Sequence, residues 1–502
     1  MKKRIWWHKA SLGSVVLLSL ASPSFSQTVD FWLRGTGLRA ESFSSNVRQL
    51  GMAGLWVAVR DENNELNLYD FGKNTAWLPF DKESTYTDDD FTSSFRKGLR
   101  PGWDKDKLSL SRTRGVFYKV DYSAKSVGAS LVVHRLGKEI SLPDGTKSSF
   151  DIIAPTVEAS LARALNPYVT VALKATVGRE GEAKTSQEFY VVNQTSALYG
   201  GGGAVAVTGL GGVALGATLD FDRAKVISIS KDNFHDDSYE YTAPSVTASM
   251  QGAVEAGETA QGAIELTYNS RTGDETGRIN WSDGFPRNPL ATNLSMKYDT
   301  YSDEYKSREL RTRWMVRVAP VSMNVGTFFN AYERKYWKTP ESGWLGIVLD
   351  RDLTLGTIQN RHEAATGFST GGGLVFEFPG RAGIIGGELE YSRADAETIL
   401  TAGSWIVNQD DLALRFGLEV RVSNKLLLRG GVCREGFSPN RDVATYDLTV
   451  TELTAGAGVN PRGRDWSVDF AWGSKWWKGE SLDLIGEVRK LSYYSLYCRF
   501  LF

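Results

Sequence analysis

The sequence closes with Leu491-Ser-Tyr-Tyr-Ser-Leu-Tyr-Cys-Arg-Phe-Leu-Phe502, and this stretch points to the class of fold. Successive side chains of an extended strand point to opposite faces, so residues two apart share a face. One face would carry Tyr494, Leu496, Cys498, Phe500 and Phe502, and the other Ser495, Tyr497 and Arg499. An apolar face backed by a more polar one predicts a β-strand that has an apolar environment on one side and a polar environment on the other.

Two all-β architectures fit such a strand. A terminal phenylalanine with apolar residues at alternate positions is similar to the signal read by the machinery that inserts bacterial outer-membrane barrels, which implies that barrel-assembly machinery as a partner. The residues that would carry the signal are Tyr494, Leu496, Phe500 and Phe502. In the alternative, a soluble sandwich, the apolar face would form the core.

The first 26 residues favour export. A basic start with Lys2, Lys3 and Arg4 precedes an apolar stretch at 12–21, and Ser24-Phe-Ser26 puts small residues where a signal peptidase cleaves. We therefore expect 1–26 to be a signal peptide that is removed on the way to the cell outer membrane. No later stretch reaches about 18 consecutive apolar residues, so the sequence predicts no membrane-spanning helix.

The composition excludes one class of partner. The 58 basic and 59 acidic residues give a formal net charge of −1, which offers no electrostatic attraction to nucleic acid. Hydrophobic residues make up 41% of the chain, with 51 glycines, 15 tryptophans and 20 tyrosines. This suits many glycine-tolerant strands with aromatic belts in a membrane, and it would also suit a large soluble β protein.

Strict alternation is clearest in the C-terminal half. Apolar residues at Leu412, Leu414, Phe416, Leu418, Val420 and Val422 alternate with Asp411, Arg415, Glu419 and Arg421. With the signal peptide and the closing strand, this predicts an all-β, antiparallel transmembrane β-barrel with an apolar exterior and a charged lumen. About 19 alternating segments occur, and because bacterial barrels usually have an even number, the segment count allows up to about 18 strands.

A segment near the start resembles a known family. Asn46-Val-Arg-Gln-Leu-Gly-Met-Ala-Gly-Leu-Trp-Val-Ala-Val-Arg-Asp61 is followed by the triplet Asn74-Thr75-Ala76. This order is similar to the mature N-terminus of the FadL-type outer-membrane transporters of long-chain fatty acids and hydrocarbons, together with their PorV-like relatives. The matching residues are Arg48, Leu50, Gly51, Met52, Ala53, Gly54, Val57, Ala58, Val59, Asp61, Asn74 and Ala76. Thr75 departs from the pattern, because the family has proline there.

A second match supports the same family. Glu419–Gly431 is similar to the family's strand, short turn and next strand, and Phe437-Ser-Pro439 resembles the start of an outer loop. The resemblance implies 14 strands and an N-terminal plug inside the barrel. We expect 27–106 to form the plug, or hatch, with its linker, and 107–502 to form the barrel, which closes on 491–502. In the alternative, Leu50–Val59 is the first barrel strand.

The resemblance also implies a function. FadL-type proteins are outer-membrane channels for passive uptake of small hydrophobic molecules such as long-chain fatty acids. PorV-like relatives instead bind and anchor secreted proteins at the cell surface. For the channel, we expect outer-membrane lipid and a hydrophobic small-molecule ligand as partners, with an entry site in a long outer loop. The candidate residues for that entry site are Tyr336, Trp337, Trp344 and Leu345. In the alternative, the aromatic residues among them belong to the outer interfacial girdle.

Motifs for catalysis are weak. His362-Glu363 lacks a second histidine four residues later, so it does not form a zinc-hydrolase motif. The run Gly200–Gly203 lacks the lysine of a phosphate-binding loop, and glycines in strands more often permit close packing. We therefore predict no enzyme, no cofactor and no metal site.

Overall fold

The computed structural model describes residues 47–59, 74 and 76, and most of 83–501. Gaps within the latter range lie at 97–107, 125–126, 142–146, 151–155, 180–182, 188–189, 209–210, 233–234, 257–258, 282–294, 319–320, 341–360, 401–402, 442–443, 446–447, 460–465 and 480–488. Among the residues so described, no helix has the length and apolar character needed to cross a membrane.

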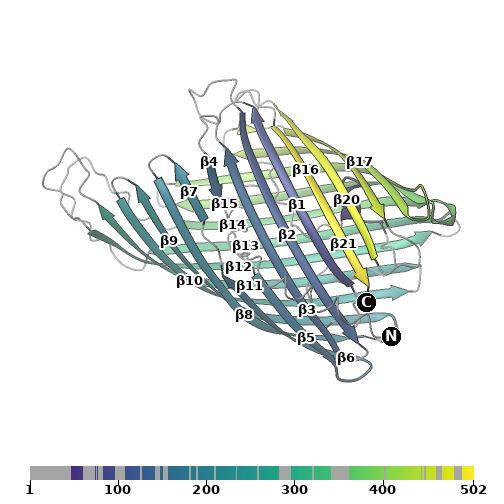
Figure 1. Ribbon diagram of the computed structural model, residues 1–502, viewed down its shortest axis with the longest axis horizontal. Helices are drawn as coiled ribbons and strands as arrows, with labels where there is room; N and C mark the ends of the chain where they lie inside the picture. Colours follow the sequence, from purple (N-terminus) through teal and green to yellow (C-terminus); the bar gives the residue numbers. More distant parts are fainter. Residues whose placement is uncertain are drawn as a thin grey trace, which may run out of the picture.

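In the part of the chain that the structure describes, twenty-one strands form one antiparallel sheet, whose arrangement is drawn in Figure 1. The first eleven are β1 (Glu83–Arg96), β2 (Leu108–Ala124), β3 (Val127–Ser141), β4 (Lys147–Phe150), β5 (Thr156–Ala164), β6 (Val169–Arg179), β7 (Ala183–Gln187), β8 (Tyr190–Val207), β9 (Val213–Asp232), β10 (His235–Ala256) and β11 (Ala260–Trp281). The others are β12 (Ser295–Val318), β13 (Met323–Pro340), β14 (Arg361–Glu377), β15 (Gly383–Leu400), β16 (Gly403–Arg421), β17 (Leu426–Arg441), β18 (Ala444–Thr445), β19 (Leu448–Val459), β20 (Trp466–Gly479) and β21 (Arg489–Leu501). The described helices are short: α3 (Val47–Leu50) and the 3-10 turn η3 (Pro379–Arg381).

The sheet closes on itself. β1 pairs with β2 on one side and with β21 on the other, where Asp88 lies opposite Leu496. The short strands β4 and β18 pair with the last residues of β3 and β17, and the short strand β7 pairs with the first residues of β8. Setting these three aside, the described ring contains eighteen strands. This number agrees with the limit of about 18 strands that the alternating segments allow, and it exceeds the fourteen that the resemblance implies.

The barrel begins earlier than the sequence predicts. β1 falls inside 27–106, the range assigned to the plug and linker, so the boundary at residue 107 was wrong. The ladder joins backbone groups, and a stretch rich in threonine and aspartate can therefore pair without apolar alternation. The alternative that makes Leu50–Val59 the first barrel strand was also wrong, because 47–50 is a helical turn and β1 is the first described strand.

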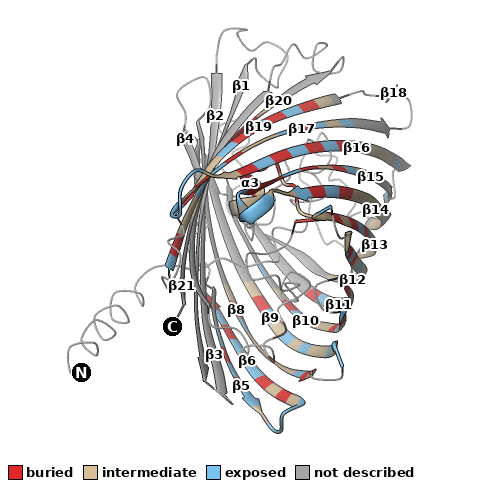
Figure 2. Cartoon of the chain, turned by 90° about the vertical axis from the view of Figure 1, so that its right-hand side faces the viewer, coloured by how far each residue is buried: buried red, intermediate tan, exposed pale blue. Residues whose placement is uncertain are grey.

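Burial confirms the predicted facing of the C-terminal strands. On β16, Leu412 and Phe416 are 53% and 51% exposed, whereas Arg415 and Glu419 are 9% and 5% exposed. Figure 2 shows the resulting bands of exposed and buried residues along neighbouring strands. A soluble protein buries its apolar side chains, so this inverted pattern means that the apolar face points out of the barrel.

The two ends of the barrel differ in their connections. One end has short connections, such as 165–168, 257–259, 319–322 and 422–425, and we call it the turn end. The other end includes the longer connections 97–107, 282–294, 341–360 and 480–488. β1 starts and β21 finishes at the turn end, so the ring both opens and closes there.

Candidate functional site

Residues 47–59, which we call the inner segment, pack against the inner wall (Figure 2). The segment starts with α3 and continues as turns, and its side chains at Met52, Leu55 and Val57 have no exposed surface. Such a segment forms no strand ladder, so its backbone groups need other partners. Side chains of the wall supply several of them.

Inward-facing glycines form the surface beneath the segment. The set is Gly326, Gly386, Gly417, Gly431 and Gly456, on β13, β15, β16, β17 and β19, and we call it the glycine track. Gly417 lies directly opposite Gly386 on one side and Gly431 on the other. A Cβ on Gly417 would come within 2.8 Å of the Met52 Cβ, and one on Gly431 within 2.4 Å of the Met52 carbonyl carbon. The missing side chains therefore let the segment's backbone approach the wall.

Two glycines of the segment itself have different tasks. A Cβ on Gly51 would meet the side chain of Arg429 at 3.2 Å, so close packing favours glycine there. Gly54 has φ +79°, a backbone conformation that residues other than glycine adopt only at a cost in free energy. Hydrogen bonds hold the backbone between them: Ala53 N–H donates to Thr454 Oγ1 at 2.9 Å, and that hydroxyl donates to Gly51 O at 3.1 Å.

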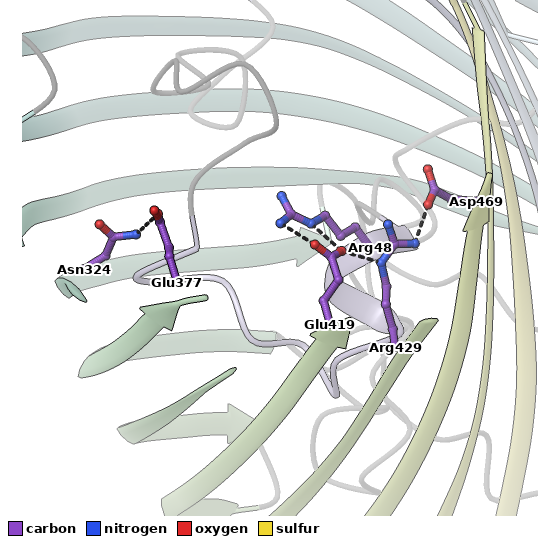
Figure 3. Close-up of polar contacts among 6 residues, drawn as sticks. All are labelled: Arg48, Asn324, Glu377, Glu419, Arg429 and Asp469. Carbon is purple, nitrogen blue, oxygen red and sulfur yellow. Dashed lines mark hydrogen bonds and ion pairs between the residues drawn. The ribbon is translucent and has the colours of Figure 1, made fainter. Parts of the chain in front are cut away.

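A buried ion cluster fixes the start of the segment (Figure 3). Arg48 donates from Nε and Nη2 to the two carboxylate oxygens of Glu419, both at 2.9 Å. Glu419 also accepts from Nε of Arg429 at 2.7 Å, and Arg429 in turn binds Asp469. Two-point pairing between a guanidinium and a carboxylate is strong and directional. The cluster thus joins α3 to β16, β17 and β20.

A second group holds the end of the segment, and we call Arg313, Glu388 and Arg415 the wall clamp. Glu388 accepts from the backbone N–H groups of Trp56 and Val57, at 3.1 and 2.9 Å. Arg415 neutralises Glu388 at 3.0 Å. The inward-facing carboxylate of Glu388 therefore accepts hydrogen bonds from two backbone N–H groups that have no partner in a strand ladder.

Arg313 completes the clamp from the other side. It donates to the carbonyl oxygens of Trp56, Val57 and Val59, at 2.6, 3.2 and 2.9 Å. Its guanidinium also lies over the Trp56 ring, 5.3 Å from the centroid, and that ring packs 5.0 Å from Phe328. One wall arginine thus combines hydrogen bonds to the backbone with a cation–π contact.

Residues 74 and 76 contact a different part of the wall. Asn74 donates to the carbonyl oxygen of Val205 at 3.3 Å and accepts from the N–H of Ala76 at 3.0 Å. Ala76 is fully buried in a cluster of small residues, Ala162, Ala172 and Ala206, on β5, β6 and β8. In the ring, β8 lies nine strands from β17, which is half of the way round. The chain therefore contacts opposite arcs of the barrel.

The structure distributes the predicted site residues over several places. Arg48, Leu50, Gly51, Met52 and Gly54 lie in the inner segment, and Asn74 and Ala76 lie on the opposite arc. Tyr494, Leu496 and Phe500 lie on β21, whereas Phe502 is outside the described residues. The wall residues that hold the inner segment were not predicted as a site, although Arg415 and Glu419 were predicted to face inward.

The predicted ligand entry requires a correction. Tyr336 and Trp337 belong to β13 and not to an outer loop, and Trp337 stacks on His362 of β14 with centroids 5.3 Å apart. Aromatic residues favour strands, so β13 runs on through them to Pro340. Trp344 and Leu345 lie outside the residues that the structure describes.

These features define a class of protein. The described strands close into an antiparallel ring without an open edge, many of the outward side chains are large and apolar, and the inner wall carries charges that bind a segment of the same chain. Closure satisfies the backbone groups of every strand in lipid, which an open sheet does not. The fold is that of a membrane-spanning β-barrel of the outer-membrane type.

Comparison with known proteins gives a likeness of fold. No family model matches the sequence, and no curated protein matches it either. Among solved structures, the Ralstonia pickettii toluene transporter TbuX is 8% identical with a TM-score of 0.37, and the match covers 92% of this chain and 99% of that one. A Pseudomonas aeruginosa FadL homologue is 12% identical with a TM-score of 0.34, and covers 91% and 98%.

A barrel with a different function matches at a comparable level. The ferric citrate transporter FecA is 6% identical with a TM-score of 0.38, over 83% of this chain and 78% of its own. The likeness therefore distinguishes no function among these barrels.

Proposed function

We propose that the protein is an outer-membrane channel for passive uptake of small hydrophobic molecules, and that its N-terminal part is a plug that closes the lumen. The observation that carries the proposal is the attachment of this part to opposite arcs of the ring, at the glycine track and at Ala162, Ala172 and Ala206. A plug attached at both places would obstruct the lumen. Long-chain fatty acids are the ligand that the N-terminal pattern implies.

The physical need for such a channel is general. The lipopolysaccharide leaflet hinders apolar solutes, so a barrel that admits them supplies a path that the lipid does not. The fixed plug would prevent free leakage of polar solutes. Polar anchors suit this role, because ion pairs and backbone hydrogen bonds orient a segment more sharply than apolar contact alone.

Uptake by cells tests the proposal. Radiolabelled toluene and a radiolabelled long-chain fatty acid would be supplied to a strain that lacks the protein and to the same strain complemented with the full chain. We expect faster uptake of at least one of them after complementation. Slower migration after boiling, on a detergent gel, would verify that the barrel is folded in the membrane fraction. A folded barrel with no gain in uptake of either compound would contradict a channel.

A second candidate is a protein-anchoring barrel. The buried ion cluster and the wall clamp favour it, because they tie the inner segment to the wall through ion pairs and backbone hydrogen bonds. Cross-linking of whole cells that express the full chain distinguishes the two. A stoichiometric adduct with an exported protein, combined with no uptake, would support anchoring.

A further inference from the structure

The outward face of β12 changes from apolar to charged part-way along the strand. Near the turn end, Trp314 is 48% exposed, as expected of a side chain that faces lipid. Every second residue shares that face, and beyond Leu310 these residues are Arg308, Lys306 and Glu304. Since charged side chains avoid hydrocarbon, the edge of the hydrocarbon layer lies between Leu310 and Arg308.

The charged stretch lies on the outer side of the membrane. It is close to the long connections 282–294, which precedes β12, and 341–360, which follows β13, and it is away from the turn end. Barrels of this type have short turns in the periplasm and longer loops at the cell surface. The outward side chains of this stretch therefore face the headgroups of the outer leaflet.

Three cations come together there on two adjacent strands, and we call Lys306, Arg308 and Lys335 the basic patch. Lys306 lies directly opposite Lys335 in the ladder, and Arg308 lies opposite Glu333. Like charges in directly opposite positions destabilise a sheet. The opposed lysines are therefore unfavourable unless anions surround them.

Two glutamates supply part of that negative charge. Lys306 pairs with Glu304 at 2.5 Å. Glu333 pairs with Lys335 at 2.5 Å and lies 3.8 Å from Arg308. Three cations and two carboxylates leave one positive charge, and 72% of the Arg308 side chain is exposed. Ion pairs between exposed side chains are weak, so a phosphate group with several acceptor oxygens can bind the same cations.

An aromatic pair continues the patch away from the membrane. Trp337 lies opposite Glu304 and stacks on His362 of β14, with centroids 5.3 Å apart. Nζ of Lys306 lies 5.9 Å from the centre of the Trp337 ring, so the pair adjoins the basic patch.

The height of the patch exceeds a phospholipid headgroup. At about 3.3 Å per residue and a tilt of about 45°, the six residues from Leu310 to Glu304 reach roughly 14 Å beyond the hydrocarbon edge. The headgroup layer of a phospholipid bilayer is only about 5–8 Å thick on each side. A larger headgroup is needed to contact both Arg308 and Trp337.

We propose that the basic patch and the Trp337–His362 pair bind the phosphorylated saccharide headgroup of a lipopolysaccharide in the outer leaflet. Its phosphates lie near the hydrocarbon edge, where Arg308 and the two lysines donate to them. Its sugars extend farther out, where their C–H faces pack on the Trp337 ring. The site is on the lipid side of the wall, so it is separate from the lumen and does not depend on uptake.

Native mass spectrometry of the purified full chain, in detergent micelles with added lipid, tests the site. The probes are a lipopolysaccharide with its core sugars, the same lipid after enzymatic removal of its phosphates, and phosphatidylglycerol. The wild-type protein is expected to bind the phosphorylated form about tenfold or more tightly than the dephosphorylated form, since charge-assisted hydrogen bonds act only on the former. Equal binding of these two forms would overturn the proposal, and so would phosphatidylglycerol bound as tightly as the lipopolysaccharide.

Variants then locate the phosphates. A triple variant with Lys306→Gln, Arg308→Gln and Lys335→Gln should lose the preference for the phosphorylated form. Arg434→Gln is the matched control, because it removes another exposed outward arginine, on β17, that lies between Leu414 and Thr451 in the ladder. This control should keep the wild-type preference. A triple variant that is folded, as shown by its gel shift on boiling, and that keeps the preference would refute the basic patch.

A further variant tests the contact with sugar. Trp337→Ala should weaken binding of the lipopolysaccharide with its core sugars and leave binding of phosphorylated lipid A without the core unchanged. Equal losses for both lipids would refute a contact between Trp337 and the sugars.

The uptake assay separates this inference from the proposed channel. Phosphate-dependent lipid binding without any gain in uptake would reject only the channel. A gain in uptake with equal binding of the phosphorylated and dephosphorylated lipids would reject only the lipid site.

Discussion

Arg48 and Glu419, 371 positions apart in the chain, form a two-point ion pair in which both nitrogen–oxygen distances are 2.9 Å. The carboxylate also receives Arg429, so one buried glutamate serves an arginine of the inner segment and an arginine of the wall. This shared carboxylate links the N-terminal segment directly to the barrel wall. It makes the attachment of the segment open to test by single substitutions.

Removal of the shared carboxylate should release the inner segment. Glu419→Ala leaves Arg48 and Arg429 without their common partner, and breaking a buried pair on one side costs about 3–5 kcal/mol. Hydrogen exchange at residues 50–57, followed by mass spectrometry, should show a matching loss of local protection. Asp395→Asn removes an exposed partner of Arg393 outside the inner segment and should leave that exchange unchanged. Equal protection in Glu419→Ala and the wild type would show that the pair does not hold the segment.

A side chain on the glycine track should displace the segment without opening the barrel. In Gly417→Val, the new Cβ would lie 2.8 Å from Met52 Cβ and 2.9 Å from Met52 O. The ladder of β16 does not depend on that contact, so the gel shift on boiling should persist while cells become more permeable to hydrophobic antibiotics. Gly203→Val on β8 is the control, because its Cβ would find only Ala172 O at 3.7 Å. Unchanged permeability in a folded Gly417→Val barrel would argue against a plug.

The backbone conformation of Gly54 predicts a graded series. At φ +79° an L-residue costs about 1–2 kcal/mol, and asparagine tolerates this region better than alanine. The free energy of local opening at residues 52–57, from hydrogen exchange, should therefore fall in the order glycine, asparagine, alanine. A Cβ on Gly54 would lie 3.7 Å from Nε of Arg415, which is an ordinary van der Waals contact. The order of stabilities would therefore reflect backbone strain and not a steric clash. Equal free energies of local opening in the Gly54→Ala variant and the wild type would mean that the segment does not hold this turn conformation.

The facing of β16 predicts a difference between the two sides of the wall. Phe416→Arg puts a charge on the lipid side, which costs about 2–4 kcal/mol near the bilayer midplane. Thr218→Arg puts it on the inner side of β9, beside Ser249, and should cost much less because water and polar groups solvate it. Refolding equilibria in lipid vesicles measure both. Glu419→Arg does not serve as the inner variant, because it would place a third guanidinium beside Arg48 and Arg429.

Alternation in the sequence determined much of the wall by itself. The side-chain period of two assigns Leu412 and Phe416 to one face and Arg415 and Glu419 to the other, whichever strands lie beside them. The same rule does not find β1, because its pairing with β21 uses backbone groups of a polar stretch. Tyr336 and Trp337 show the opposite error, since aromatic residues that suggest a loop surface equally suit a long strand.

The attachment of the inner segment was decided only by the tertiary structure. The sequence marks Arg48, Gly51 and Gly54 as a local pattern, but their partners Glu419, Arg429 and Arg415 lie on strands hundreds of positions away. No local propensity records which strand of a closed ring will face a segment inside it. Gly417 and Gly431 likewise destabilise a strand by their intrinsic preference. The reason for glycine at these positions is visible only in the tertiary structure, where Met52 packs against them. Ring closure brings these residues together, because it fixes each strand's neighbours and the direction in which every second side chain points.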